Sequence, residues 1–378
     1  MNRERTYLDW NATAPLRPEA REAMLRALDV TGNPSSVHGE GRAARRLIED
    51  AREQVAALVG ARPQAVIFTS GATEANAMVA AGRAWQSTVM PLIEHPSIGQ
   101  PLHQSNGVMI AVGADGVAAI GDELVPYLTN ASLQWPVLVT MQLANSETGA
   151  IQDVGGLTLL CRMHRPDAFA HSDATQAAGR IAVDFAALGV DAMTISSHKL
   201  GGPKGAGALI VCDGTELAPL IGGGGQERRR RAGTENVAAI AGFGAAAVAA
   251  QAGLATYGKI STLRGRLEAE VLRLSPEAII VAHDAPRLAN TSCIALAGRA
   301  AETLVTALDL AGIAVSAGAA CSSGKVAASH VLQAMGLDAR IARAAIRISI
   351  GPTTTENDIA AFLAAWNQIT GSVASLAA

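Results

Sequence analysis

Short apolar segments alternate with amphipathic stretches through the first two thirds of the chain. Apolar residues between positions 44 and 58 recur at helical spacing and Gly60 follows them, which predicts an amphipathic helix. Short apolar runs predict strands at residues 65–68, 89–93, 137–142, 168–171, 190–195 and 208–212, and helical stretches such as 156–164 lie between several of them. Strands and helices that alternate in this way predict an α/β fold with a mostly parallel sheet and crossover helices.

The pattern changes after about Gly253. A long helix is predicted over residues 259–274, then strands near 279–282 and 292–297, a helix at 301–310, a strand at 345–350 and a last helix over about 356–370. This order predicts a second, smaller α+β domain. We therefore expect a large domain over residues 16–255, and a small domain made of residues 1–15 and 256–378.

Composition restricts the class of protein. Of the 378 residues, 49% are hydrophobic and 17% are charged, which is typical of a globular chain with a large core. A net charge of −3 gives no sign of nucleic-acid or membrane binding. The polar N-terminus lacks the apolar segment of a signal peptide, and no apolar run reaches the roughly 20 residues of a membrane helix. We expect a cytoplasmic protein, and the few charges suggest that an oligomer buries part of the surface.

The cysteines indicate neither a metal site nor a disulfide framework. The chain has four of them, Cys161, Cys212, Cys293 and Cys321. They form no CxxC pair and no Cys/His pair at zinc-finger spacing. The first three lie in predicted apolar helices or strands and are interpreted as packing residues. Cys321 lies in residues 316–324, a segment of small residues that favours an exposed, mobile and reactive thiol; an inert buried cysteine is the alternative.

Lys199 is the strongest candidate for chemistry. It follows the apolar run 190–195 in a loop of serine, histidine and glycine, which is the setting of a Schiff-base lysine in a pyridoxal phosphate enzyme. Ser196 and His198 beside it can donate hydrogen bonds to a phosphate. Asp173 ends another apolar strand, where a carboxylate can pair with a pyridinium nitrogen. The alternatives are a surface lysine and a carboxylate that caps a strand.

Two further segments have both a structural and a functional interpretation. Ser70, Gly71, Ala72 and Thr73 join a strand to a helix, where free amides and the helix dipole form a phosphate site. Taken alone, an ordinary helix cap is the more common explanation. His95 is either a hydrogen-bonded loop histidine or an imidazole that stacks on a cofactor ring and moves a proton.

Arginines supply the candidate anion-binding groups. Arg347 interrupts an apolar strand, where an inward-facing guanidinium needs an anionic partner: a substrate carboxylate, or a carboxylate of the protein in a structural ion pair. Residues 228–231 are four arginines that follow the glycines 222–225. They are either a solvated charge run or a mobile basic loop that reaches a phosphate.

Together these residues resemble the NifS/IscS-type cysteine desulfurases, relatives of the class V aminotransferases with fold type I of the pyridoxal phosphate enzymes. The resemblance covers nearly the whole chain, from residues 7–15 to the last helix. Its motifs are residues 32–36 (GNPSS), 70–74 (SGATE), 171–176 (HSDATQ), 197–199 (SHK), 231–234 (RAGT) and the Cys321 segment. The resemblance implies a large domain with a mostly parallel seven-stranded sheet and helices on both faces, and a small α+β domain that carries Cys321.

The resemblance also implies roles for single residues in binding pyridoxal 5'-phosphate. Lys199 matches the lysine bound covalently to the cofactor, and Asp173 matches the partner of its pyridinium nitrogen. Gln176 is similar to the residue that contacts the phenolic oxygen, and His95 to the stacking imidazole. The positions that match phosphate-binding residues are Ala72, Thr73, Ser196 and His198.

Other matching positions concern the substrate and a second subunit. Asn11 and Arg347 match positions near the carboxylate of L-cysteine. Cys321 matches the nucleophile that accepts sulfur as a persulfide, which can transiently ligate an iron–sulfur cluster together with a scaffold; no resident metal is expected. Thr234 matches a residue that reaches the phosphate in the neighbouring subunit, which implies a homodimer.

The chain departs from the family pattern in two places. Family members usually carry two asparagines before Glu-x-Gly, and here Ser146 takes the second place, so that its contact with the cofactor is lost or made through water. The chain also ends soon after the last helix, which puts the general iron–sulfur scaffold in doubt as its partner. The sulfur acceptor is therefore a cluster scaffold or another carrier, such as one for tRNA thiolation or nitrogenase assembly.

The predicted activity is the removal of sulfur from L-cysteine, which gives L-alanine and a persulfide on Cys321. A selenocysteine lyase or a cysteine-sulfinate desulfinase of the same fold is the first alternative. A non-catalytic, dimeric interaction protein is the second, and Ser146 is the feature that favours it.

Overall fold

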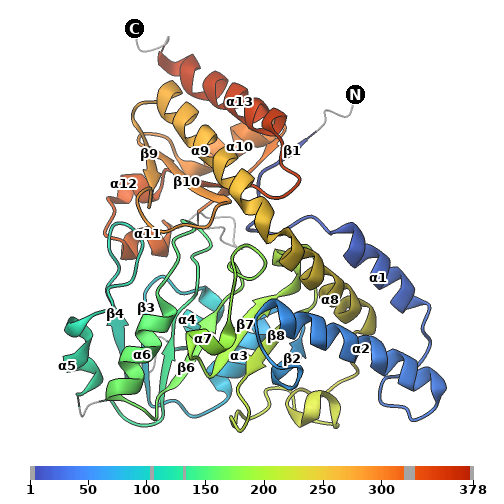
Figure 1. The fold of residues 1–378 in the computed structure, drawn as a ribbon. Coiled ribbons are helices and arrows are strands. Elements are labelled where there is room, and N and C mark those ends of the chain that lie inside the picture. Colours follow the sequence, from blue (N-terminus) through green and yellow to red (C-terminus); the bar gives the residue numbers. More distant parts are fainter. Residues whose placement is uncertain (1–4, 103–105, 131–132, 319–327, 375–378) are drawn as a thin grey trace.

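The computed structural model describes residues 5–102, 106–130, 133–318 and 328–374 (Figure 1). A larger unit built on one wide sheet lies at the bottom of the view, and a smaller unit with its own sheet lies above it. Both ends of the described chain lie on the smaller unit.

The sheet of the larger unit has seven strands in the order β2-β8-β7-β6-β5-β3-β4. The strands are β2 Val66–Thr69, β3 Ser87–Pro91, β4 Asn106–Ile110, β5 Val137–Thr140, β6 Phe169–Asp173, β7 Ala192–Ser196 and β8 Gly207–Val211. Strands β4, β3, β5, β6 and β7 pair in parallel, whereas β8 runs antiparallel to both of its neighbours, β7 and β2. The predicted mostly parallel seven-stranded sheet is confirmed; the reversed direction of β8 was not predicted.

Helices cover both faces of this sheet. They are α1 Pro18–Leu28, α2 Gly39–Leu58, α3 Ala72–Ala81, α4 Pro96–Leu102, α5 Val125–Leu128, α6 Val154–His164, α7 Phe185–Leu188 and α8 Val237–Ala252. One core joins α1, α2, α6 and α8 to side chains such as Phe68. A second core joins α3 and α4 to the alternate strand residues, such as Ile67. Two packed faces explain why these strands appear in the sequence as continuous apolar runs.

The smaller unit is α+β, as predicted. An antiparallel sheet has the order β12-β13-β10-β9, and a short parallel pair joins β1 to β11. The elements are β1 Thr6–Tyr7, α9 Tyr257–Leu274, β9 Ala278–Val281, β10 Thr291–Leu296, α10 Ala301–Leu310, β11 Ile313–Ala314, β12 Ser316–Ala317, α11 His330–Ala334, α12 Ala339–Ala342, β13 Ala345–Ser349 and α13 Glu356–Ala374. We keep the domain boundary after residue 255 as a proposal.

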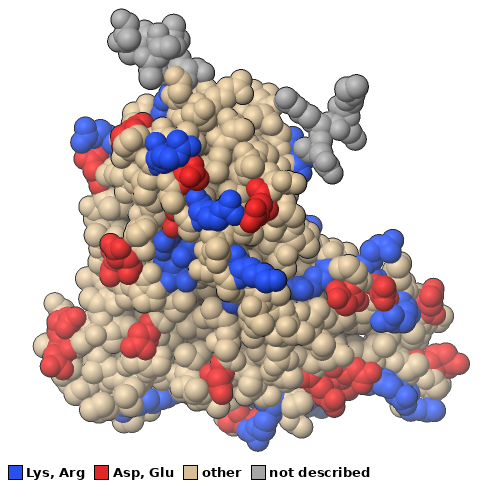
Figure 2. Space-filling view, turned by 45° about the horizontal axis from the view of Figure 1, so that its top comes forward, with Lys and Arg blue, Asp and Glu red and all other residues tan. Residues whose placement is uncertain are grey.

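The two units are joined by a long helical run, α8 followed by α9. Over residues Val237–Leu274 this run is long and apolar enough to cross a membrane by length and composition alone. Half of its most apolar window is buried inside the protein, and α8 packs against α1 and α2. That is the usual situation of a core helix in a globular fold. On the face shown in Figure 2, charged side chains of both signs are interspersed among uncharged residues.

Candidate active site

A cavity of about 800 Å³ lies at the carboxyl ends of the central strands, between the two units. In open α/β sheets this edge is where ligands bind. The cavity brings together most of the residues singled out in the sequence: Asn11, Ala72, Thr73, His95, Ser146, Asp173, Gln176, Ser196, His198, Lys199 and Arg347.

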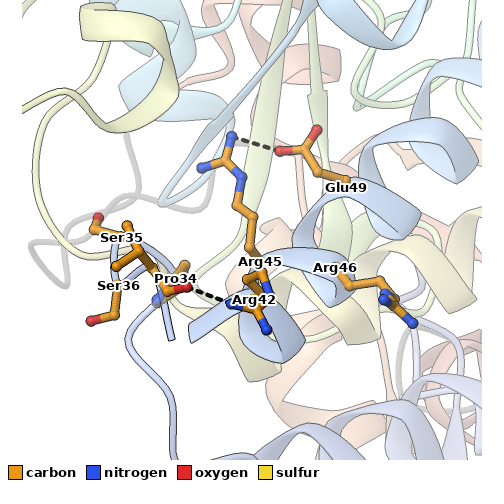
Figure 3. Close-up of a pocket in the computed structure, with 8 residues that line it drawn as sticks. Pro34, Ser35, Ser36, Arg42, Arg45, Arg46 and Glu49 are labelled. Atoms are coloured by element: carbon orange, nitrogen blue, oxygen red, sulfur yellow. Dashed lines mark hydrogen bonds and ion pairs between the residues drawn. The ribbon is translucent and has the colours of Figure 1, made fainter. Parts of the chain in front are cut away.

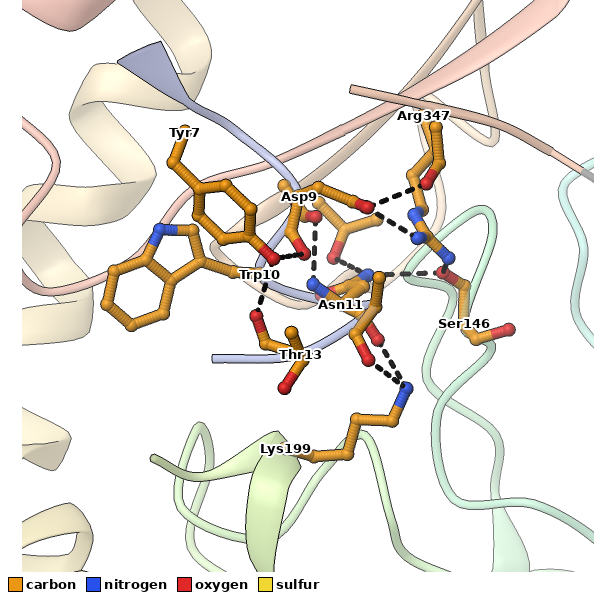
Figure 4. A network of polar contacts seen from close by, with 12 residues as sticks. Tyr7, Asp9, Trp10, Asn11, Thr13, Ser146, Lys199 and Arg347 are labelled. Atoms are coloured by element: carbon orange, nitrogen blue, oxygen red, sulfur yellow. Dashed lines mark hydrogen bonds and ion pairs between the residues drawn. The ribbon is translucent and has the colours of Figure 1, made fainter. Parts of the chain in front are cut away.

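Lys199 lies in a short 3-10 turn that follows β7 directly. Its Nζ donates to the carbonyls of Asn11, at 2.6 Å, and Ala12, at 3.0 Å (Figure 4). Burial, together with the positive charges of Arg347 and Arg180, lowers the pKa of Lys199 to about 7. A large share of the amine is therefore neutral near pH 7, which an amine needs to attack a carbonyl.

Asp173 is the last residue of β6 and is almost fully buried. One carboxylate oxygen accepts from Asn76 Nδ2 at 2.8 Å, and the other accepts from the amide of Thr175 at 2.9 Å. Asn76 lies wholly buried inside α3. Nothing in the sequence singled it out, because a lone asparagine within a helical segment has no motif around it.

The part of the cavity lined by Ala72, Thr73 and His198 has the features of an anion site. Helix α3 begins at Ala72, and the first amides of a helix have no partner within it. Strand β8 comes so close that a Cβ on Gly207 would lie 2.6 Å from the carbonyl carbon of Gly71. Burial lowers the pKa of His198 to about 4, so that its imidazole is neutral at pH 7. Its Nδ1 lies 3.1 Å from Thr13 Oγ1.

His95 follows β3, and its Nδ1 lies 2.7 Å from Ser97 Oγ. Burial lowers the pKa of His95. The preceding residue, Glu94, was not recognised in the sequence, although it also lines the cavity. It is buried and accepts from the amide of Gln142 at 2.8 Å, and burial raises its pKa to about 8. Its second oxygen, Oε2, has no partner among the described residues.

Arg347 lies on β13. The sequence offered two partners for it, a carboxylate of the protein and a substrate carboxylate, and the structure is compatible with both. Its Nη2 donates to Asp9 Oδ1 at 2.8 Å, and its Nη1 donates to the carbonyl of Ser146 at 3.1 Å (Figure 4). The structural ion pair therefore exists. The side chain also lines the cavity, and its buried Nε has no partner in the described part of the chain. Two of its five N–H donors are used in this way, and the other three, including that of Nε, remain for a ligand.

Asn11 and Ser146 are placed differently from what their predicted roles suggest. The Asn11 side chain is fully buried, and its amide nitrogen donates to Ser146 O and Thr291 Oγ1. Its side-chain oxygen accepts from Arg180 and Asn290. This amide has therefore no hydrogen-bonding capacity left for a substrate. Ser146 lines the cavity, and its backbone carbonyl accepts hydrogen bonds from the side chains of Asn11 and Arg347.

One predicted residue that the structure describes, Thr234, does not belong to this cavity, and another lies outside the described residues. Thr234 is exposed and does not line it, so its role toward a neighbouring subunit stays a prediction. Cys321 lies outside the described residues. Gly318 before it and His330 after it both line the cavity. Glu147 also lines the cavity and accepts from Ser329 Oγ at 2.6 Å, and burial raises the pKa of Glu147 to about 7.

A second hollow, of about 510 Å³, lies where residues 34–37 lead into α2 (Figure 3). It contains the GNPSS motif's last residues and three arginines, Arg42, Arg45 and Arg46. Arg45 pairs with Glu49 at 2.7 Å.

In the described part of the chain, no group of three or more histidine, cysteine or carboxylate side chains is placed to hold a metal ion.

Comparison with known proteins agrees with this geometry. Residues 6–362 match the class V aminotransferase family. A cysteine desulfurase of Cereibacter sphaeroides is 40% identical over 94% of this chain and 93% of its own length, and an IscS-like cysteine desulfurase of Mycobacterium tuberculosis is 38% identical over 94% of each. The chain therefore belongs to the class V aminotransferase family, within its cysteine desulfurase branch.

Solved structures lead to the same family. A NifS-like protein from Rickettsia africae has a TM-score of 0.90 and 36% identity, with 97% of this chain and 99% of that chain covered. A more distant structure, SspA, was solved in complex with cysteine; it has a TM-score of 0.76 and 27% identity, and covers 93% of this chain and 100% of its own.

Proposed function

We propose that the cavity binds pyridoxal 5'-phosphate and that Lys199 holds it covalently. The cavity volume lies within the range of small-molecule sites, about 300–1,000 Å³. Three buried polar atoms of its lining, Thr175 Oγ1, Glu94 Oε2 and Arg347 Nε, lack partners among the described residues, which suits a polar ligand. An amine of lowered pKa and a buried carboxylate face the same space.

Each part of the cofactor has a matching group in the lining. The amides of Ala72 and Thr73, with Ser196 and neutral His198, suit the phosphate. Asp173 suits the ring nitrogen, because Asn76 and Thr175 hold its carboxylate in place. His95 would cover one ring face. We also propose that Gln176 donates to the phenolic oxygen, that Ser146 makes at most an indirect contact, and that Thr234 completes the phosphate site of a second copy.

The function that these features support is that of a cysteine desulfurase. The observation that carries it is the position of Lys199, a partly neutral amine, in one cavity with Asp173 and Arg347. When bound, the cofactor supplies an electron sink for the bonds around the substrate's α-carbon. Arg347 binds the substrate carboxylate through the N–H groups that Asp9 and Ser146 leave free, and the Lys199 amine takes the α-proton.

Sulfur transfer requires a thiol, for which we propose Cys321. Its thiolate attacks the sulfur of cysteine; an S–S bond forms, the Cβ–S bond breaks, and the carbon takes up a proton to give alanine. A persulfide remains on Cys321 and passes to an acceptor, which is an iron–sulfur scaffold or another sulfur carrier. We further propose that the protein is a cytoplasmic homodimer. Exposed apolar side chains beside the GNPSS motif, Leu25, Leu28 and Val37, suit a subunit contact.

The test is to incubate the purified protein with pyridoxal phosphate and L-cysteine, and to measure alanine and persulfide. We expect Lys199→Ala to lose both the visible absorbance of the bound cofactor and alanine formation. Cys321→Ala should keep the absorbance and form no persulfide, whereas Cys212→Ala, on a strand end far from the cavity, should behave as wild type. Normal sulfide release by Cys321→Ala would contradict the assignment, and faster turnover of selenocysteine or cysteine sulfinate would favour the related activities.

A further inference from the structure

Arg180 is a buried cation for which the proposed function provides no role. It is 4% exposed and lies in the turn after β6. No carboxylate in the described part of the chain forms an ion pair with it; its guanidinium donates instead to four neutral oxygens. These are Asn11 Oδ1 at 2.7 Å, Gln176 Oε1 at 2.5 Å, and the carbonyls of Trp10 and Lys199, both at 3.3 Å.

Such a position is unfavourable for the free energy of folding. A buried charge without a counter-ion loses its hydration and regains only part of it from neutral acceptors. Burial accordingly lowers the pKa of Arg180 to about 10, and the neighbouring Tyr257 hydroxyl opposes this shift. A leucine or methionine would fill the same space without that cost. We therefore ask which groups Arg180 orients, because orientation of these groups would explain why an arginine occupies this position.

The first of these groups is the carboxamide of Gln176. A guanidinium carries donors only, so the atom of Gln176 that faces Arg180 must be its oxygen. The Gln176 nitrogen then points the other way, and one of its two hydrogens is donated to the carbonyl of Asn11 at 3.2 Å. Gln176 lines the cavity, so the group that it can offer a ligand is the remaining N–H. Arg180 thus makes Gln176 a donor and prevents the flipped amide.

The second group is the chain segment that holds Lys199. Arg180 binds the side chain of Asn11 and the carbonyl of Trp10, and the carbonyl of Asn11 accepts from Lys199 Nζ at 2.6 Å. Arg180 also binds the carbonyl of Lys199 itself. One guanidinium therefore fixes the lysine backbone and the carbonyl that holds the lysine amine.

We propose that Arg180 is a positioning residue of the cofactor site, which acts by holding Gln176 as a hydrogen-bond donor to the ligand and by fixing residues 10–12 against Lys199. This inference rests on the proposed function, because it assumes that pyridoxal phosphate is the ligand. The positive charge of Arg180 also lowers the pKa of Lys199, as the charge of Arg347 does.

The test is a double-mutant cycle read out by cofactor affinity rather than by turnover. The variants are Arg180→Met, Gln176→Met and the double variant, each titrated with pyridoxal phosphate while its visible absorbance is followed. The control is Arg165→Met, because Arg165 likewise donates to uncharged oxygens: among the described residues, the carbonyls of Leu128, Asn130 and Leu133, beside the end of α6. Thermal unfolding of each variant shows whether it is folded.

We expect Arg180→Met to weaken cofactor binding by about 10- to 100-fold, as for the loss of a charge-assisted hydrogen bond. Because Arg180 acts through Gln176, the double variant should bind within about twofold of the weaker single variant. Arg165→Met should bind as wild type does. Unchanged affinity of a folded Arg180→Met protein, or losses that multiply in the double variant, would overturn the proposal.

A second substitution keeps the test decisive if Arg180→Met does not fold. Arg180→Lys retains the positive charge, but a single ammonium cannot span Gln176, Asn11 and two carbonyls as the planar fork does. It should fold and bind the cofactor about 3- to 10-fold more weakly than wild type. Wild-type affinity in Arg180→Lys would overturn the proposal. If the wild-type protein itself bound no pyridoxal phosphate, the proposed function would fail first.

Discussion

The guanidinium of Arg347 donates to the carboxylate of Asp9 across 2.8 Å, although the two residues lie 338 positions apart. The other oxygen of Asp9 accepts from Ser316 Oγ at 2.8 Å. Asp9 stands between β1 and the residues that line the cavity, and its backbone bridges to Ser349. Asp9 of the N-terminal segment thus orients the guanidinium of Arg347, which we propose to bind the substrate carboxylate.

Replacement of Asp9 by asparagine should impair substrate binding more than cofactor binding. Asparagine keeps the shape but loses the charge that holds the guanidinium, so Arg347 is less well oriented. We expect Asp9→Asn to raise KM for cysteine by roughly 5- to 20-fold with little change in the affinity for pyridoxal phosphate. Steady-state kinetics and cofactor titration measure the two quantities. Asp338→Asn, which removes an exposed ion pair with Arg340, is the control. An unchanged KM in Asp9→Asn would contradict this role.

Asp173→Asn should separate cofactor binding from chemistry. Asparagine can still accept from Asn76 or Thr175, but it has no charge to offer a protonated ring nitrogen. We expect the variant to bind the cofactor and to form alanine on the order of 100-fold more slowly. The absorbance of the bound cofactor and the rate of alanine formation test this. A variant as fast as wild type would show that the carboxylate does not face the ring.

Glu94 should make the stability of the protein depend on pH. The pKa of Glu94 is raised by burial from 4.5 to about 8, so that between these values the folded state holds a proton that the unfolded state has lost. The contribution of Glu94 to stability therefore falls as the pH rises through this range. A glutamine does not titrate and retains the acceptor for the Gln142 amide.

The expected result is that Glu94→Gln becomes more stable relative to wild type as the pH rises. From pH 5 to pH 8 the difference in the free energy of unfolding should grow by about 1–3 kcal/mol. Denaturant unfolding at both pH values, with the cofactor at saturation, measures it. The exposed Glu277→Gln should show the same difference from wild type at both values. A constant difference for Glu94→Gln would show that this carboxyl is ionised in the folded protein.

A left-handed turn offers a test of backbone strain. Glu227, Arg228 and Arg229 have φ values of 43°, 56° and 64°, a region that non-glycine residues rarely occupy. Glu227 is held there by Arg52, whose two Nη atoms donate to its carboxylate at 2.8 Å. Arg229 is exposed, so Arg229→Gly should relieve strain and stabilise the protein by about 0.5–1 kcal/mol. Arg229→Ala keeps the Cβ and should give no gain in thermal unfolding; equal stability of the two variants would refute the argument.

The sequence predicted the central strands because both of their faces are buried, which produces continuous apolar runs. It missed β4, an edge strand that begins Asn106-Gly107, where a Cβ on Gly107 would lie 2.5 Å from the Thr88 carbonyl. The direction of β8 was also missed, because an apolar run carries no information on strand direction. Both depend on contacts with neighbouring strands rather than on local pattern.

The residues of the candidate site also fall into two groups: those that the sequence could identify and those that only the structure could identify. Lys199, Asp173 and His95 stand at strand ends within recognisable motifs, and the structure places them in one cavity. Arg180 and Asn76 are isolated polar residues whose importance appears only from partners far along the chain, such as Asn11 and Asp173. Residues of this kind cannot be found from one sequence, because a buried and an exposed polar residue look the same in it.

The covalent attachment of the cofactor can be measured directly, because the chain has only four lysines: Lys199, Lys204, Lys259 and Lys325. Lys204 lines the same cavity and is the natural competitor. The protein is mixed with pyridoxal phosphate, reduced with borohydride, digested and mapped by mass spectrometry. We predict a pyridoxyl group on Lys199 and unmodified Lys204. A label on another lysine, or none on any, would contradict the central claim.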